Sequence, residues 1–186
     1  MTQFETQLRE LTNTPESWGV LKDDWQRQCE PHGETIDDYA IGAMSTIEDL
    51  VLTPAARAKP LGLYDTMGNC HAVCFANIAN IPGYREPVLR IRHIVLSPNY
   101  DFGALDSSAY EAAITTMFAG VVSRAFGDMR AKHIKFHLRS PADVSFFSAV
   151  AKTLASVPVF QTVQMKGAWL YLDLAEIGDL GTGAEA

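Results

Sequence analysis

Apolar side chains recur every three or four residues in the first third of the chain, which is the spacing of one helical face. The first stripe follows Thr14-Pro15, an N-cap residue with a proline at the first helical position; it consists of Trp18, Leu21, Trp25 and Cys29. The second stripe follows the pair Thr35 and Asp38, which resembles a capping box; it consists of Ile36, Ala40, Ala43, Ile47 and Leu50. These stripes predict two helices within residues 14–52.

Short apolar runs bounded by turn residues begin near residue 61, and they predict strands. The predicted strands are 61–64, 70–78, 88–96, 133–138, 159–165 and 168–174. Two helices lie between them, one over 110–125 and one that begins at Ser140-Pro141-Ala142-Asp143. Because the first of these helices makes a crossover, strands 88–96 and 133–138 should be parallel. The fold class predicted is α/β or α+β, with a mixed sheet flanked by helices.

Length and charge narrow the class of protein. The chain has 186 residues, 15 of them Lys or Arg and 22 Asp or Glu, so its formal net charge is −7. We expect a single domain over 1–176 and a flexible acidic tail over 177–186. An acidic protein is repelled by phosphate backbones, so no nucleic-acid partner is expected. With no apolar run near the roughly 18–20 residues of a membrane span, and no signal-peptide features, we expect no membrane partner and a cytoplasmic location.

Two segments carry a family resemblance. Leu89–Tyr100 reads LRIRHIVLSPNY, and Ser140-x-x-Asp143-x-x-Phe146-Phe147 lies at the start of the last predicted helix. The first resembles the fourth strand of the GNAT superfamily of acyl-CoA N-acyltransferases, and the second resembles that family's Asn-x-x-Ala-x-x-Phe-Tyr. The order of elements over 61–174 is also similar. The resemblance therefore implies a GNAT-like sheet.

The resemblance also implies an activity, which is transfer of an acyl group from acetyl-CoA or another acyl-CoA directly to an amine. The acceptor would be an amine of a small molecule or of a protein. The pantetheine arm would bond the backbone near Ile94, Val95 and Leu96, and the pyrophosphate would lie at the turn formed by Phe102, Gly103 and Ala104. Family members often dimerise, so a homodimer is expected.

The pyrophosphate turn departs from the family's Arg/Gln-x-x-Gly-x-Gly pattern. Asp101 stands at the Arg/Gln position, and Ala104 and Asp106 stand at the two glycine positions. Two acidic side chains would repel a pyrophosphate, and a capping box of Ser108 and Glu111 would occupy the N–H groups at the helix start. Two alternatives therefore stay open. One is a transferase that takes its acyl group from an acyl carrier protein; the other is a catalytically silent module that binds a ligand or self-associates.

The family's catalytic positions are also changed. Its strand carboxylate is replaced by Arg90, which stays protonated, and its tyrosine by Phe147, which has no proton to give. Tyr100, His93, His137 and Glu86 could replace them by position, and His93 and Tyr100 are the candidates that we name. His93 is preferred because an imidazole titrates near neutral pH, although it could instead be an ordinary strand histidine.

The remaining candidate residues are two arginines, two aromatic residues and the cysteines. Arg90 and Arg92 share one strand face and could bind the carboxylate or phosphate of a substrate, or could pair with acidic side chains. Trp169 and Tyr171 are expected in core or interface packing. Cys70 and Cys74 would lie about 13 Å apart on one strand at ~3.3 Å per residue, too far for one zinc ion, so the three cysteines are expected to be buried core residues and no metal is expected.

Overall fold

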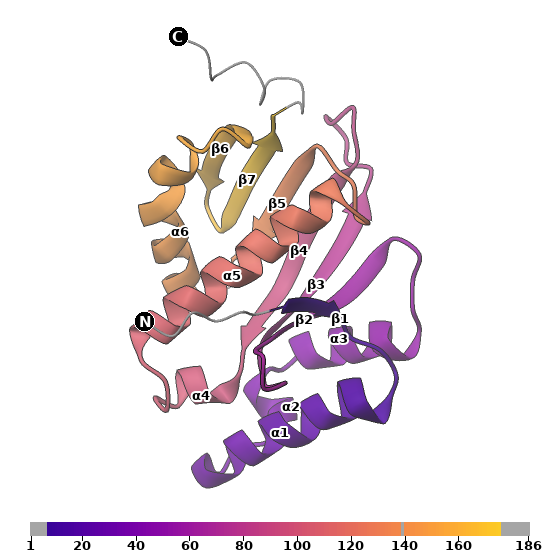
Figure 1. The fold of residues 1–186 in the computed structure, drawn as a ribbon, viewed down its shortest axis with the longest axis vertical. Helices are drawn as coiled ribbons and strands as arrows, with labels where there is room; N and C mark the ends of the chain where they lie inside the picture. Colours follow the sequence, from indigo (N-terminus) through magenta and orange to yellow (C-terminus); the bar gives the residue numbers. More distant parts are fainter. Residues whose placement is uncertain (1–6, 139, 176–186) are drawn as a thin grey trace. The chain divides into compact units, whose positions relative to one another are not determined.

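The computed structural model describes residues 7–138 and 140–175, and Figure 1 shows its strands and helices. The strands are β1 (Gln7–Glu10), β2 (Ala58–Tyr64), β3 (Cys70–Ala79), β4 (Val88–Leu96), β5 (His133–His137), β6 (Phe160–Lys166) and β7 (Trp169–Leu174). The helices are α1 (Val20–Cys29), α2 (Ile36–Tyr39), α3 (Ala43–Leu52), α4 (Pro98–Asp101), α5 (Ser107–Phe126) and α6 (Pro141–Leu154), with a helical turn at Pro15–Gly19 before α1.

The strands are hydrogen-bonded in the order β1-β2-β3-β4-β5-β7-β6. β4 and β5 are parallel over the register Val88↔His133 to Ile91↔Phe136, as the crossover through α5 requires. The ladders β1–β2, β5–β7 and β6–β7 are antiparallel. The predicted fold class, a mixed sheet flanked by helices, is confirmed.

The chain divides into two compact units, which are described separately. The first unit comprises the described residues up to Ala76 together with His93–Arg124, and the second comprises Asn77–Arg92 with the described residues from Ala125 onward. β3 and β4 each contribute residues to both units. The predicted domain boundary at residue 176 and the predicted tail lie outside the described residues.

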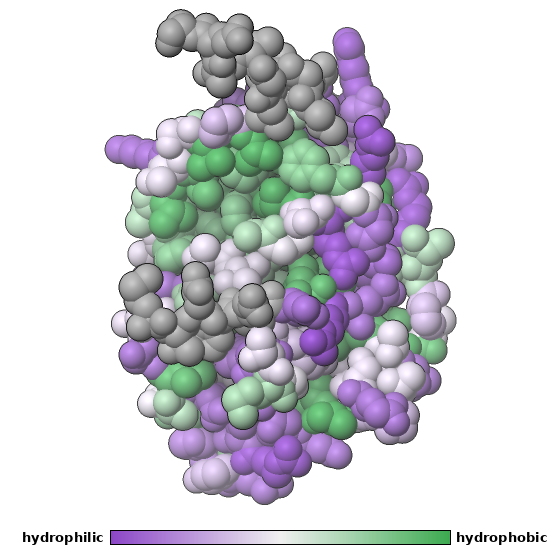
Figure 2. Space-filling view, viewed as in Figure 1, coloured by the Kyte–Doolittle hydropathy of each residue, from purple (hydrophilic) through white to green (hydrophobic). Residues whose placement is uncertain are grey.

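The apolar stripe of the first predicted helix is buried in the first unit. Its members Trp18, Leu21, Trp25 and Cys29 are between 0% and 5% exposed. The polar residues between them, such as Asp23 and Arg27, face outward, and Figure 2 shows hydrophilic side chains gathered over the lower end of the view, where α1 lies. This prediction is confirmed, and the amphipathic pattern is its physical cause.

The second predicted helix does not form as one element, so this prediction is wrong. The chain forms α2, leaves the helical conformation, and begins α3 after Gly42, whose φ of 73° is left-handed. The break rotates the following residues, so that Met44, Ile47 and Val51 are buried, while Leu50 is only half-buried. Thr35 caps α2 as predicted, because its hydroxyl accepts a hydrogen bond from the Asp38 N–H.

Helices cover both faces of the strands in the first unit. Val73 of β3 belongs to the apolar cluster formed by the helices α1–α3. Its neighbour Cys74 points to the other face, where its sulfur lies 3.7 Å from that of Met117 on α5. In the same unit, Gly120 of α5 lies against Leu8 of β1, where a Cβ would be only 3.0 Å from the Leu8 side chain.

In the second unit, α6 covers the apolar face of the C-terminal strands. Its capping box is formed as predicted, because Ser140 and Asp143 each accept a hydrogen bond from the other's backbone N–H. Phe147 of α6 packs near Phe136 of β5, with 6.3 Å between the ring centroids.

Two short elements were not predicted, namely β1 and α4. Each has four residues, too few to show a period.

Among the residues that the structure describes, none of the helices combines the length and apolar character that a bilayer crossing requires.

Candidate active site

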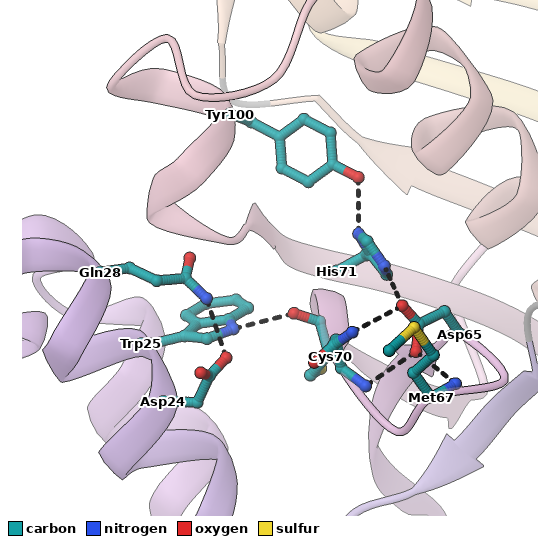
Figure 3. Close-up of polar contacts among 9 residues, drawn as sticks. Asp24, Trp25, Gln28, Asp65, Met67, Cys70, His71 and Tyr100 are labelled. Carbon is teal, nitrogen blue, oxygen red and sulfur yellow. Dashed lines mark hydrogen bonds and ion pairs between the residues drawn. The ribbon is translucent and has the colours of Figure 1, made fainter.

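Tyr100, one of the two predicted catalytic residues, lies in α4 directly after β4. Its hydroxyl points toward His71 of β3 (Figure 3). The backbone beside it is fixed, because Ser97 N–H donates to the His71 carbonyl over 2.9 Å and Tyr100 N–H donates to the Ser97 carbonyl over 3.0 Å. Tyr100 is 9% exposed. Its phenol therefore has a defined position next to β3.

Three side chains form a hydrogen-bonded series that begins at this phenol. The Tyr100 oxygen lies 2.8 Å from Nδ1 of His71, and Nε2 of His71 lies 3.1 Å from Oδ2 of Asp65. Asp65 sits in the turn between β2 and β3, where it also accepts hydrogen bonds from the N–H groups of Met67 and Asn69 and from the Asn69 side chain (Figure 3). The side chains of His71 and Asp65 are 13% and 15% exposed. We call this series the Tyr100–His71–Asp65 chain.

The direction of the hydrogen bonds in this chain follows from Asp65. Burial raises the pKa of its carboxyl, but the hydrogen bonds from Asn69 and His71 outweigh burial and hold the pKa below its usual range. The carboxylate is therefore an acceptor, and Nε2 of a neutral His71 carries the proton that it receives. Nδ1 is then an acceptor, and the Tyr100 hydroxyl donates to it.

The Tyr100 phenol stays protonated at neutral pH. Burial, with the negative charge of Asp65 and the nearby Cys70, raises its pKa to about 12. A proton that arrives at the Tyr100 oxygen can be taken up as the phenol proton passes to His71, and Asp65 then stabilises the imidazolium. The Ser-His-Asp triad uses the same order of groups, with a serine in the place of Tyr100.

The N-terminal helices hold the backbone around Tyr100. The Gln28 side chain of α1 accepts a hydrogen bond from the Asn99 N–H over 3.2 Å. The Tyr39 hydroxyl of α2 lies 2.7 Å from Oδ2 of Asp101 and 3.0 Å from the carbonyl of Leu96, so its single proton serves one of them at a time. Trp25 donates its indole N–H to the carbonyl of Cys70, next to His71 (Figure 3). The two helices therefore position α4 and the start of β3.

The second predicted catalytic residue, His93, occupies an unusual place in β4. Its φ of 52° is left-handed, which is rare outside glycine, and its ring centroid lies 6.3 Å from that of Phe75. The histidine that contacts the Tyr100 hydroxyl is His71. No observation here tests a catalytic role for His93, which stays a prediction.

The predicted cofactor-binding residues fall into two groups. Ile94, Val95 and Leu96 form the end of β4, where the Leu96 carbonyl has Tyr39 as a neighbour. Phe102, Gly103 and Ala104 join α4 to α5. The Phe102 ring stacks on His32 with 4.1 Å between centroids, and Gly103 has a φ of 77° with open space where a Cβ would stand. The left-handed backbone conformation therefore favours glycine at this position.

The start of α5 does not fit a pyrophosphate. Asp106, and not Ser108 as predicted, caps this helix: its Oδ1 accepts hydrogen bonds from the Ala109 N–H (2.9 Å) and from the Ser108 hydroxyl (2.7 Å). The prediction was wrong because the helix begins at Ser107, one residue before Ser108, so that Asp106 holds the N-cap position. These hydrogen bonds lower the pKa of Asp106, so its negative charge occupies the place where a helix start would attract a phosphate.

The predicted substrate-binding residues Arg90 and Arg92 lie on β4 in the second unit. Burial, with the charge of Arg90 nearby, lowers the pKa of the Arg92 guanidinium. Arg90 stands opposite Lys135 of β5 in the strand register and lines a pocket with it. Trp169 and Tyr171, which were expected in packing, line the same pocket and are half-buried.

The three cysteines are buried and free, as expected. Burial raises the pKa of Cys70 and of Cys74 to about 12, and it also raises that of Cys29. Thiols of this kind are poor nucleophiles because the thiolate is the reactive form. Within residues 7–138 and 140–175, no group of three His, Cys, Asp or Glu side chains has a metal-binding arrangement.

Sequence reasoning missed His71 and Asp65. His71 follows Cys70, one of the two cysteines that are too far apart to share a zinc ion, and no pattern around it indicates a second role. A usable signal for Asp65 was the turn Asp65-Thr66-Met67-Gly68-Asn69, because aspartate in such a turn accepts backbone hydrogen bonds and is fixed in place.

Comparison with known proteins supports the fold. No protein-family model matches the chain, and no curated protein matches it. Solved structures do match the chain. A probable acetyltransferase from Staphylococcus epidermidis aligns with a TM-score of 0.51 and 9% identity, covering 90% of this chain and 98% of its own. A spermidine N-acetyltransferase chimera of the Vibrio cholerae and hSSAT proteins aligns with a TM-score of 0.50 and 12% identity, covering 95% and 99%. The chain therefore shares its fold with these solved acetyltransferases.

Proposed function

We propose that the chain is an N-acyltransferase that transfers an acyl group from a thioester directly to an amine. The observation that carries the proposal is the Tyr100–His71–Asp65 chain, which can accept a proton, in a fold shared with N-acetyltransferases. Fold alone does not define activity, so the proposal depends on this chain of hydrogen bonds. The acceptor is an amine of a small molecule or of a protein.

In the proposed reaction these three residues have one role, which is to remove a proton from the amine. The amine nitrogen attacks the thioester carbonyl; a C–N bond forms, the C–S bond breaks, and the sulfur leaves as a thiolate. The amine proton passes to the Tyr100 oxygen while the Tyr100 proton moves to Nδ1 of His71. His71 then gives this proton up, through Tyr100, to the thiolate. General acid–base catalysis of this kind typically contributes about 10²–10⁴-fold to a rate.

The donor is proposed to bind through its pantetheine arm, along the backbone of Ile94, Val95 and Leu96. The nucleotide of CoA would contribute little, because Asp106 already occupies the start of α5. A thioester of pantetheine alone should therefore serve about as well as acetyl-CoA. The same reasoning favours an acyl carrier protein over CoA as the natural donor, because such a donor has no pyrophosphate.

The test is a thiol-release assay with acetyl-CoA and with S-acetyl-pantetheine against a set of amines that includes spermidine, single amino acids and lysine peptides. The buried cysteines of the protein should give little background with the thiol reagent. We expect turnover with at least one amine, and kcat/KM values for the two donors within about tenfold of each other.

Variants connect the activity to the residues. Tyr100→Phe and His71→Gln should each lower kcat by about 10²-fold or more if both residues move the proton. His133→Gln is the matched control, because His133 also bonds an aspartate, Asp173, but has no part in the Tyr100–His71–Asp65 chain. Activity that both variants retain in full would contradict the proposed role.

A second candidate is a binding module of the same fold without transferase activity. It is favoured by two acidic residues at the proposed cofactor turn, since Asp101 is engaged by Tyr39 and Asp106 by the start of α5. Absence of turnover with every donor and amine, together with measurable ligand binding, would support this candidate.

A further inference from the structure

The second unit contains a pocket that the proposed acyl transfer does not use. Its volume is about 360 Å³, and its walls come from the segment after β3 and from strands β4, β5 and β7. Arg90, Lys135, Trp169 and Tyr171 supply the polar and aromatic side chains, and Ile81 and Pro82 add apolar surface.

The strand register brings the two cations of this pocket together. Arg90 pairs with Lys135 across β4 and β5, and Lys135 pairs with Tyr171 across β5 and β7. Residues that pair directly across neighbouring strands point to the same face. Their chain neighbours Leu89, Ile134 and Leu172 are buried on the other face, which α6 covers. The two positive charges therefore stand side by side on one face.

Aromatic rings hold the lysine in position. Its ammonium nitrogen lies 4.5 Å from the centroid of the Tyr84 ring and 4.7 Å from that of Tyr171. Such cation–π contacts keep the charge next to apolar surface without neutralising it. Lys166 adds a third cation, whose ammonium nitrogen lies 5.3 Å from the centroid of the Tyr171 ring.

Acidic side chains do not balance these charges. Within the described part of the chain, neither Arg90 nor Lys135 forms an ion pair with a carboxylate. Asp173 lies on the same face of β7 as Tyr171, but its two oxygens bond to His133 and to Thr162. In a protein of net charge −7, two adjacent cations without a carboxylate partner are an unusual local excess of positive charge.

We propose that this pocket binds a small organic anion, with its carboxylate or phosphate between Arg90 and Lys135 and a flat apolar body against Trp169 and Tyr171. A planar guanidinium binds two oxygens of either group, and the ammonium adds a point charge. The aromatic side chains and Pro82 favour an unsaturated ring over a sugar or a polyamine. The proposal does not rest on acyl transfer, because binding is measured without any reaction.

The test is a titration of the ¹⁵N-labelled full chain followed by two-dimensional NMR, with benzoate and phenyl phosphate as probes. Benzylamine has the same ring with the opposite charge, and acetate has the charge without the ring. We expect benzoate or phenyl phosphate to shift the Trp169 indole N–H and the amides of Lys135 and Tyr171 saturably, with acetate weaker and benzylamine silent. The tighter-binding probe shows whether the pocket prefers a carboxylate or a phosphate. Either preference supports the proposal.

Three variants locate the binding. Lys135→Met keeps the aliphatic stem but removes the charge, and should weaken the better anion about tenfold. Lys152→Met, on the exposed surface of α6, removes the same charge from the same unit and should leave binding unchanged. Arg90→Gln gives an independent test if Lys135→Met disturbs the spectrum of the unliganded protein.

Three results would overturn the proposal. The first is equal binding of benzylamine at the same amides, which would mean that charge plays no part. The second is the absence of any saturable shift with either anion up to about 10 mM, a concentration that detects millimolar dissociation constants. The third is unchanged affinity in the folded Lys135→Met or Arg90→Gln variant.

Discussion

Tyr100→Phe removes one hydroxyl and leaves the ring in place, so its effect isolates the hydrogen bond to His71. That bond is 2.8 Å long and lies between side chains that are largely buried, with Tyr100 9% exposed. A hydrogen bond of this kind contributes about 0.5–1.5 kcal/mol net, and a buried partner left without its donor costs about 1–3 kcal/mol. Because His71 keeps Asp65, we expect a loss of about 1–2 kcal/mol in the free energy of unfolding.

The assay is thermal and urea unfolding of the variant and of the unmodified protein. For a chain of this size, 1 kcal/mol lowers Tm by roughly 2–4 °C, so Tm should fall by about 2–8 °C. His71→Gln and the double variant complete a double-mutant cycle. If the two groups interact, the double variant should lose about 1 kcal/mol less than the sum of the single losses.

The cycle also separates the structural role of the phenol from its chemical role. Proton transfer through Tyr100 predicts a fall in kcat of about 10²-fold or more, while a purely structural role predicts a loss of stability with kcat unchanged. An unchanged Tm with additive single losses would refute the reasoning, because it would mean that the hydroxyl and the imidazole do not interact in solution.

Three further predictions test the turn, the capping box and the buried carboxyl. Asp106→Asn keeps a capping side chain but removes its charge, so Tm should change little while KM for acetyl-CoA falls relative to KM for S-acetyl-pantetheine in steady-state assays. Ser140→Ala should cost about 1 kcal/mol in urea unfolding, whereas Ser145→Ala, on the exposed face of the same helix, should cost nothing or stabilise slightly. Asp65 has a folded pKa below its unfolded value of roughly 3.9, so its stabilisation is present above that pH and is lost as the pH falls through the folded value. Thermal melts across pH should therefore show Asp65→Asn less stable at pH 7, with the difference shrinking below about pH 4.

Most of the fold could be predicted because its elements are long enough to show a period. The stripe from Trp18 to Cys29 is buried, and so are the apolar positions Leu89 and Ile91 that alternate with the arginines of β4. Burial is what sequence periodicity reports. β1 shows no such pattern. Its residues are mostly exposed, and its backbone is held by β2, where Glu10 pairs with Leu61 about fifty residues further along the chain. Strand pairing between residues so far apart in the sequence produces no pattern in the local sequence.

The candidate site was harder to predict than the fold because its parts are brought together by tertiary structure. The sequence resemblance drew attention to β4 and therefore to His93, whereas the histidine next to Tyr100 lies 29 positions earlier, on β3. Tyr100 itself was found, because it ends the segment that resembles the family strand. What placed His71 beside it is the hydrogen bond from Ser97 N–H to the His71 carbonyl, a contact between the end of β4 and the start of β3.

The departures from the family motif are explained together by the connection between β4 and α5. Side chains of the protein itself take part in this connection: Asp106 accepts a hydrogen bond from the Ala109 N–H at the start of α5, and the Tyr39 hydroxyl lies against both Asp101 and the Leu96 carbonyl. A turn that must wait for a ligand has unsatisfied donors, and leaving them buried or unpaired costs stability. At Ala109 this cost is avoided, because Asp106 accepts its N–H. Asp106 therefore does more than repel a phosphate, because it stands in for one as a partner of the helix start. In the proposed reaction, a donor would then have to be selected through its pantetheine arm and its acyl group, and not through its nucleotide.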